Sequence, residues 1–195
     1  MLDDVVIKDA LHYLGAKEGD KDAEALLRKV LNDCRGAFCP RQITAFFPVD
    51  KTFPAVTFSG CEIVLEGESI RRHFSGATEG LFSAFTLGIS FDKKVRELSF
   101  VRPAESVALN AIGSAYAERK ADEMLKEVCL KKEAEGFKTN FRFCPGYGDL
   151  PLGVNAMIAA ALNAGNRIGL TVTDGGLLLP IKSIVGVTAC LPVKE

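Results

Sequence analysis

The clearest pattern along the chain is that of amphipathic helices. Between residues 23 and 34, apolar residues recur at the spacing of one helical face, and an aspartate at position 20 or 22 can cap that helix. The longest periodic stretch runs from Pro103 to about Glu135, which predicts a helix of roughly 45 Å. Its first half is rich in small residues, so another backbone could approach it closely. Shorter helices are predicted at 8–14, 68–74, 92–98 and 152–163, the first ended by Gly15 and the last by Gly165.

Strands are indicated by short β-branched or aromatic runs separated by Pro, Gly and Ser, the pattern of antiparallel strands. The stretch 81–89 fits a helix or a strand equally well. No internal repeat or linker divides the chain. We therefore predict an α+β fold, a single domain over residues 1–195, with a mostly antiparallel, bent sheet and packed helices including one long helix. The predicted strands are 43–47, 55–58, 61–65, 139–143, 168–172, 177–179 and 183–190, with a turn at 173–176.

Charge and composition exclude several kinds of partner. The 24 Lys and Arg are balanced by 25 Asp and Glu, so there is no basic field to attract nucleic acid. No apolar run approaches the ~20 residues of a membrane-spanning helix. The start at Met1 is followed by acidic residues where a signal peptide needs positive charge. We expect a cytoplasmic protein that binds neither nucleic acid nor membrane.

The 6 cysteines and 2 histidines offer little for a metal site. Cys34 and Cys39 are the one close pair, and neither His12 nor His73 lies near a cysteine in sequence. We predict no metal site and ordinary packed thiols, with structural zinc or disulfides as the alternatives. Both histidines are expected to be solvated or packed rather than catalytic.

A turn at Pro145-Gly146 is the strongest candidate for a functional site. Proline fixes one backbone dihedral, and glycine can adopt the positive φ of a type II turn. Such a corner would aim Tyr147 and Asp149 from a stiff backbone, and its glycines would let a ligand approach closely. Arg142, just before it, carries a forked guanidinium suited to a carboxylate. The alternative is an ordinary strand and turn in which Arg142 is simply solvated.

Five short motifs occur in order along the chain. The corner matches R-x-x-x-G-Y, and within it P-G-Y-G-D-x-P-L. Together the five motifs resemble the activation domain of cobalamin-dependent methionine synthase, especially its stand-alone versions, and they span nearly the entire chain. The other four are L-x-Y-L-G at 11–15, T-[LI]-G at 86–88, G-S-A-x-x-E at 113–118 and P-x-K-S-[VI]-x-G at 180–186.

This resemblance implies an S-adenosylmethionine-binding protein that supports reductive reactivation in methionine biosynthesis. In the family, cob(II)alamin receives an electron from reduced flavodoxin or a similar donor and a methyl group from bound S-adenosylmethionine. The chain has no room for homocysteine, folate and cobalamin domains and no D-x-H-x-x-G motif. The cobalamin would therefore be carried by a partner, either a separate cobalamin-dependent methionine synthase or another corrinoid protein. The chain would act as the accessory domain of that methyltransferase and present the methyl donor.

The resemblance also assigns candidate site residues. Arg142 would pair with the carboxylate of the methionine moiety, and Glu118 or its neighbour Asp122 with the ammonium. Tyr147 would contact the ligand or the corrinoid face and is the candidate for a catalytic role. Backbone groups that would meet adenine or ribose belong to Cys144, Pro145 and Gly146.

Two other functions stay open. After Tyr147 the chain continues with G-D-L-P, whereas domains fused to the full enzyme carry P-A-C-P and a nearby histidine. This departure favours a non-catalytic S-adenosylmethionine or corrinoid-protein binding module that reactivates or scaffolds another methyltransferase. A purely structural interaction protein, with Arg142 exposed, is the third possibility.

Overall fold

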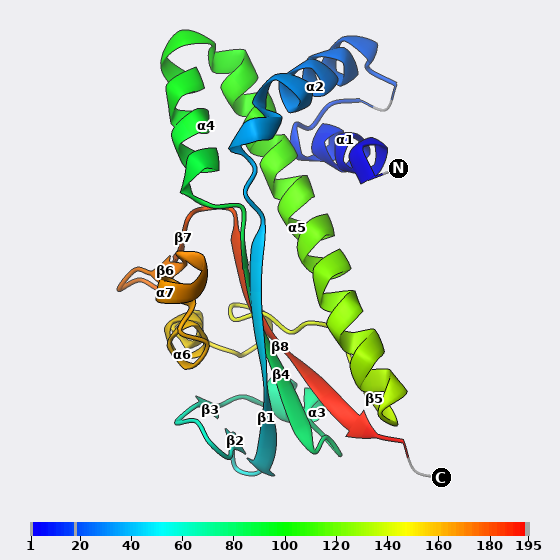
Figure 1. Ribbon diagram of the computed structural model, residues 1–195, viewed down its shortest axis with the longest axis vertical. Coiled ribbons are helices and arrows are strands. Elements are labelled where there is room, and N and C mark those ends of the chain that lie inside the picture. Colours follow the sequence, from blue (N-terminus) through cyan, green and yellow to red (C-terminus); the bar gives the residue numbers. More distant parts are fainter. Residues whose placement is uncertain (1, 18, 194–195) are drawn as a thin grey trace.

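A long helix, α5 (Pro103–Ala134), and a six-stranded sheet organise the molecule (Figure 1). The computed structural model describes residues 2–17 and 19–193, and these form an α+β fold with seven α-helices and an antiparallel main sheet. With 32 residues, α5 extends about 48 Å, as its periodicity predicts. Met1, on which the expectation about a signal peptide depends, lies outside the described residues.

The central strand of the main sheet, β4 (Glu79–Thr86), lies between the two longest strands, β1 (Arg41–Lys51) and β8 (Ser183–Pro192). The other strands of this sheet are β2 (Val56–Phe58), β3 (Val64–Leu65) and β5 (Phe137–Thr139). Their order is β3-β2-β1-β4-β8-β5, and every neighbouring pair is antiparallel. A separate hairpin pairs β6 (Thr171–Val172) with β7 (Leu178–Leu179).

The other six described helices pack around α5 and the sheet. They are α1 (Leu2–Tyr13), α2 (Lys21–Cys34), α3 (Glu68–His73), α4 (Ile89–Val101), α6 (Val154–Ala161) and α7 (Ala164–Ile168), with a short 3-10 turn at Arg35–Ala37. Figure 1 shows α1, α2 and α4 gathered around the first half of α5, while α6, α7 and the β6–β7 hairpin lie beside the sheet. None of the described helices combines the length and the apolar character needed to cross a membrane.

Strand β4 is buried on both faces, which is why its sequence fits helix and strand equally well. Phe82 and Ala84 belong to the apolar cluster that includes α6 and α7, whereas Leu81 and Phe85 face the residues of α5. A strand covered on both sides shows a continuous apolar run instead of alternation. One apolar core therefore covers one face of β4, and two further clusters, around Phe85 and around Leu81, cover the other.

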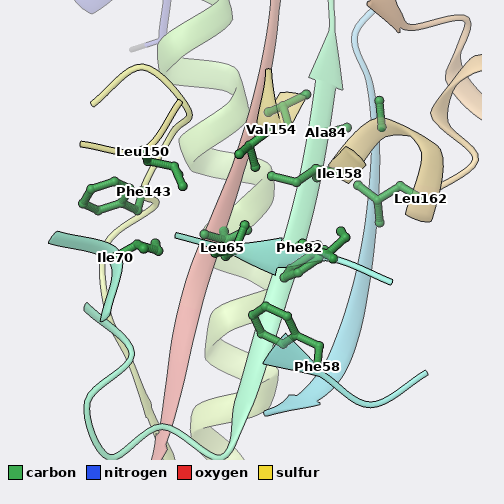
Figure 2. Close-up of a cluster of buried hydrophobic side chains, with 14 of the residues drawn as sticks. Phe58, Leu65, Ile70, Phe82, Ala84, Phe143, Leu150, Val154, Ile158 and Leu162 are labelled. Carbon is green, nitrogen blue, oxygen red and sulfur yellow. The ribbon is translucent and has the colours of Figure 1, made fainter. Parts of the chain in front are cut away.

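Figure 2 shows how the predicted corner is anchored in one of these cores. Phe143 and Leu150, which flank the corner, lie beside Ile70 in the same buried apolar cluster. Phe143 also forms an isolated bridge with Val187 of β8, with N–H to O distances of 2.8 and 2.9 Å in the two directions. The corner is thus held by buried side chains and by the edge of the sheet.

Several predicted boundaries are wrong: the predicted strands 61–65 and 168–172 are strands only over Val64–Leu65 and Thr171–Val172, and the predicted helix 92–98 extends over Ile89–Val101. Three further differences have a clear local reason. The first helix begins at Leu2 rather than Lys8, because its earlier residues also pack on the core and two acids favour its first turn. The predicted strand 139–143 is paired only as far as Thr139, apart from the bridge at Phe143. Gly165 lies inside α7 rather than ending the preceding helix. That helix ends before Asn163, which adopts the left-handed conformation (φ 50°) that asparagine tolerates.

Gly113 of α5 provides a test of the close helix packing. A Cβ atom at this position would lie 2.2 Å from the ring of Phe91 in α4. We expect Gly113→Ala to lower the free energy of unfolding by about 1–3 kcal/mol, even though alanine favours a helix by about 1 kcal/mol. Urea denaturation measures the change. Gly153→Ala is the matched control, because its Cβ would meet nothing within 4 Å and its φ is −59°; an equal loss in both variants would contradict the packing argument.

Candidate functional site

A groove of about 970 Å³ lies between the corner, α5 and the β6–β7 hairpin. Its floor includes residues 183–185 of β8, which pair with β4 on one side and with no described strand on the other. This volume suits a ligand of cofactor size. The predicted residues that line it are Glu118, Arg142, Cys144, Pro145 and Tyr147, whereas Gly146 does not.

Arg142 forms the charged end of the groove. Its Nη2 lies 2.8 Å from Glu118 Oε2 and its Nη1 lies 3.0 Å from Asp122 Oδ1. Only 11% of its side chain is exposed, so the expectation of a simply solvated arginine is wrong. The two carboxylates lie one turn apart on α5, and both pair with the guanidinium, so the sequence alternatives Glu118 and Asp122 occupy one ion-pair cluster.

Gly186 of β8 makes room for Arg142. A Cβ at Gly186 would lie 2.6 Å from Cγ of Arg142 and 3.0 Å from the carbonyl oxygen of Phe143. The stem of Arg142 therefore crosses the strand at a position where any larger residue would push it away. This contact explains the glycine that ends the motif at 180–186.

The backbone of the corner has the predicted type II geometry. The Tyr147 N–H donates to the Cys144 carbonyl oxygen at 3.1 Å, and Gly146 has a φ of +91°. The Gly146 N–H donates to the Leu150 carbonyl oxygen at 2.9 Å, which closes the loop a second time. Tyr147 lies at the groove with 65% of its surface exposed.

Asp149 has a structural role that the sequence does not reveal. Its carboxylate accepts hydrogen bonds from the N–H groups of Glu68 (2.5 Å) and Ser69 (3.1 Å) at the start of α3. These backbone donors lower the pKa of Asp149 below its ordinary value. Asp149 thus caps a helix from a distant part of the chain and does not line the groove.

Cys144 contributes a thiol to the groove wall. Burial raises the pKa of this thiol, and the nearby Arg142 guanidinium opposes that shift. Because its pKa is raised, the Cys144 thiol is protonated at neutral pH. The thiolate is the reactive form of cysteine, so Cys144 is a packed side chain and not a nucleophile.

Another part of the groove wall is fixed by a strap at residues 180–183, which the sequence did not place at the site. The Ile181 N–H donates to Asp92 Oδ2 at 2.8 Å, and Lys182 Nζ donates to Ser114 Oγ of α5 at 2.8 Å. Burial lowers the pKa of Lys182 and raises that of Asp92. Apolar wall residues that sequence reasoning also missed are Phe141, Leu152, Leu177, Leu179 and Ile181, and their exposed fractions are between 39% and 70%.

His73 lies behind the groove wall rather than in solvent. Its ring centroid is 4.8 Å from that of Phe141 and 5.3 Å from that of Phe143, both of which line the groove. Its Nε2 has no hydrogen-bond partner among the described residues. Burial lowers the pKa of His73 to about 4, so the imidazole is neutral at physiological pH.

Comparison with solved structures shows a likeness in fold. A crystal structure of the MetH reactivation domain bound to AdoHcy has a TM-score of 0.70 to this chain at 15% sequence identity, covering 94% of this chain and 70% of that one. No family model matches the chain, and no curated protein matches it. At this identity the likeness shows that the two proteins share a fold.

Because the imidazole of His73 is buried, we predict that the free energy of unfolding depends on pH. Its folded-state pKa of about 4 lies below the ordinary 6.5, so the unfolded chain binds the proton first as the pH falls. The stability that the neutral imidazole provides is complete above pH 6.5 and is lost as the pH falls toward 4, with a slope of up to about 1.4 kcal/mol per pH unit. Denaturant unfolding at several pH values measures it.

His73→Leu should reduce that slope, because leucine keeps the apolar contacts and cannot bind the proton. His12→Gln, at an exposed position on α1, is the control and should retain the slope of the wild type. If wild type and His73→Leu show the same pH profile, His73 is not the group responsible.

Proposed function

We propose that this protein binds S-adenosylmethionine in the groove beside Arg142 and presents its methyl group for the reductive methylation of cob(II)alamin on a separate cobalamin-dependent methionine synthase. The observation that carries the proposal is the assembly of Arg142, Glu118 and Tyr147 around one groove. Arg142 and Tyr147 belong to the corner and Glu118 to α5; the turn pattern and the motif resemblance both point to the first two, and the resemblance alone points to Glu118. The AdoHcy-bound structure with the same fold supports a ligand of this class.

The groove fits the chemistry of that ligand. S-adenosylmethionine has a zwitterionic amino-acid end, and the charged end of the groove offers a guanidinium and a carboxylate for it. The ligand also has an aromatic adenine ring and aliphatic carbons beside its sulfonium, and the mostly apolar remainder of the wall can pack against these groups. Tyr147 would lie where an aromatic face can contact the ligand.

In the proposed reaction, the cobalamin carried by the partner supplies the methyl acceptor, and reduced flavodoxin or a similar donor supplies the electron. This chain's residues bind and orient. Arg142 would hold the carboxylate, Glu118 the ammonium, and the rigid corner would fix where the sulfonium lies. Loss of the methyl group converts the ligand to S-adenosylhomocysteine, which should bind the same groove.

A reconstituted assay tests the full proposal. The protein is mixed with cob(II)alamin-loaded methionine synthase, a chemical reductant and S-adenosylmethionine, and methylcobalamin is followed by its absorption spectrum. Its appearance only when this protein is present would support the reactivation role. Ligand binding without methylcobalamin would instead favour the binding module that serves another methyltransferase.

Arg142 is the residue to test first. We expect Arg142→Ala to weaken S-adenosylmethionine binding by about 2–4 kcal/mol, because a partly buried carboxylate would lose its charged partner. Calorimetric titration of the purified variants measures the affinity. Arg167→Ala is the matched control, since Arg167 is exposed on α7 and does not line the groove. An unchanged affinity in Arg142→Ala would remove Arg142 from the site.

A further inference from the structure

Two acidic residues of the protein already occupy the nitrogens that a ligand carboxylate would need. Nη2 of Arg142 pairs with Glu118 and Nη1 with Asp122. Its Nε is buried and has no hydrogen-bond partner among the described residues. A ligand carboxylate must therefore approach the two Nη nitrogens, and there it meets two carboxylates of the protein.

These two carboxylates differ in position. Glu118 lines the groove, whereas Asp122, one turn further along α5, does not. The side chain of Asp122 is 64% exposed, compared with 50% for Glu118. Moving Asp122 away from Arg142 would therefore return an already hydrated carboxylate to water, and an exposed ion pair is weak.

The charge of the cluster restricts what can enter. One guanidinium and two carboxylates carry a net charge of −1. A ligand that brought a carboxylate alone would raise the negative charge further at one end of an apolar groove, which is unfavourable. A ligand that brings an ammonium next to its carboxylate leaves the charge unchanged, and Glu118 can then pair with the ammonium.

We propose that Asp122 is a built-in competitor for Arg142, displaced by the carboxylate of the bound amino-acid moiety while Glu118 stays in place to pair with its ammonium. The inference rests on the proposed function and adds a specificity device to that site. Asp122 holds Arg142 in position when no ligand is bound, sets the affinity of the site, and makes a zwitterionic amino acid the preferred ligand end.

Calorimetric titration with S-adenosylhomocysteine tests the proposal, because this probe has the amino-acid end and no transferable methyl group. Asp122→Asn should bind it about 3-fold to 10-fold more tightly than wild type, since the competing charge is gone. Glu118→Gln should bind it more weakly than wild type by about 10-fold or more, since the ammonium loses its partner. Glu127→Gln removes one negative charge from the same helix at a position outside the cluster and should leave the affinity unchanged.

A second probe separates competition from a general effect on the groove. 5′-Methylthioadenosine has the adenosine and sulfur of the ligand but lacks the amino-acid end, so Asp122→Asn should not tighten its binding. The proposal is overturned if Asp122→Asn binds S-adenosylhomocysteine no more tightly than wild type, or if it tightens both probes equally. If wild type and all variants bind neither probe, the proposed function fails with it, whereas binding by wild type with no gain in Asp122→Asn overturns the competitor alone.

Discussion

The ion-pair cluster of Arg142 with Glu118 and Asp122 is the interaction on which the site depends. A guanidinium with 11% of its side chain exposed needs charged partners, because burying an unpaired charge is costly. Both partners come from α5, so the cluster joins the corner to the long helix. The stem of Arg142 reaches them by crossing β8 at Gly186, where a side chain would block it. Arg142 therefore connects β8, the corner and α5, and it lines the groove.

The structure gives the short sequence motifs a physical role. Three of them, far apart along the chain, meet at one junction beside the groove. Lys182 donates to Ser114 of α5, and Ser183 donates to Thr86 Oγ1 at 2.8 Å. The Gly88 N–H also donates to Thr86 Oγ1, at 3.0 Å, where β4 turns into α4. These contacts hold the end of β4, the middle of α5 and the strap before β8 at fixed positions, which explains why the three motifs contain small hydroxyl residues.

Local chemistry determined what the sequence could predict. The type II turn at Pro145-Gly146 and the Asp20 cap of α2 depend on adjacent residues, and both are confirmed. The long helix is confirmed as well, over Pro103–Ala134. What the sequence could not predict depends on distant contacts. Asp149 caps α3 although it lies 81 positions from Glu68, and the apolar wall from the β6–β7 hairpin carries no recognisable signal. The role of Gly113 is an intermediate case, since small residues signalled a close approach but not its partner, Phe91.

Two parts of the groove wall differ in a way that bears on the proposed partner. The charged part contains Arg142, whose side chain is 11% exposed, whereas Leu177 and Ile181 in the apolar part of the wall are 63% and 65% exposed. Tyr147 at the mouth is 65% exposed as well. Exposed apolar residues clustered at the rim of a groove are a feature of surfaces that another molecule covers. A partner that docks here would meet the bound ligand from the apolar side while the charged end remains held by Arg142. In the proposed complex, the charged part of the groove would hold the methyl donor, and the partner would approach it over the apolar part. The rigid corner would not have to move.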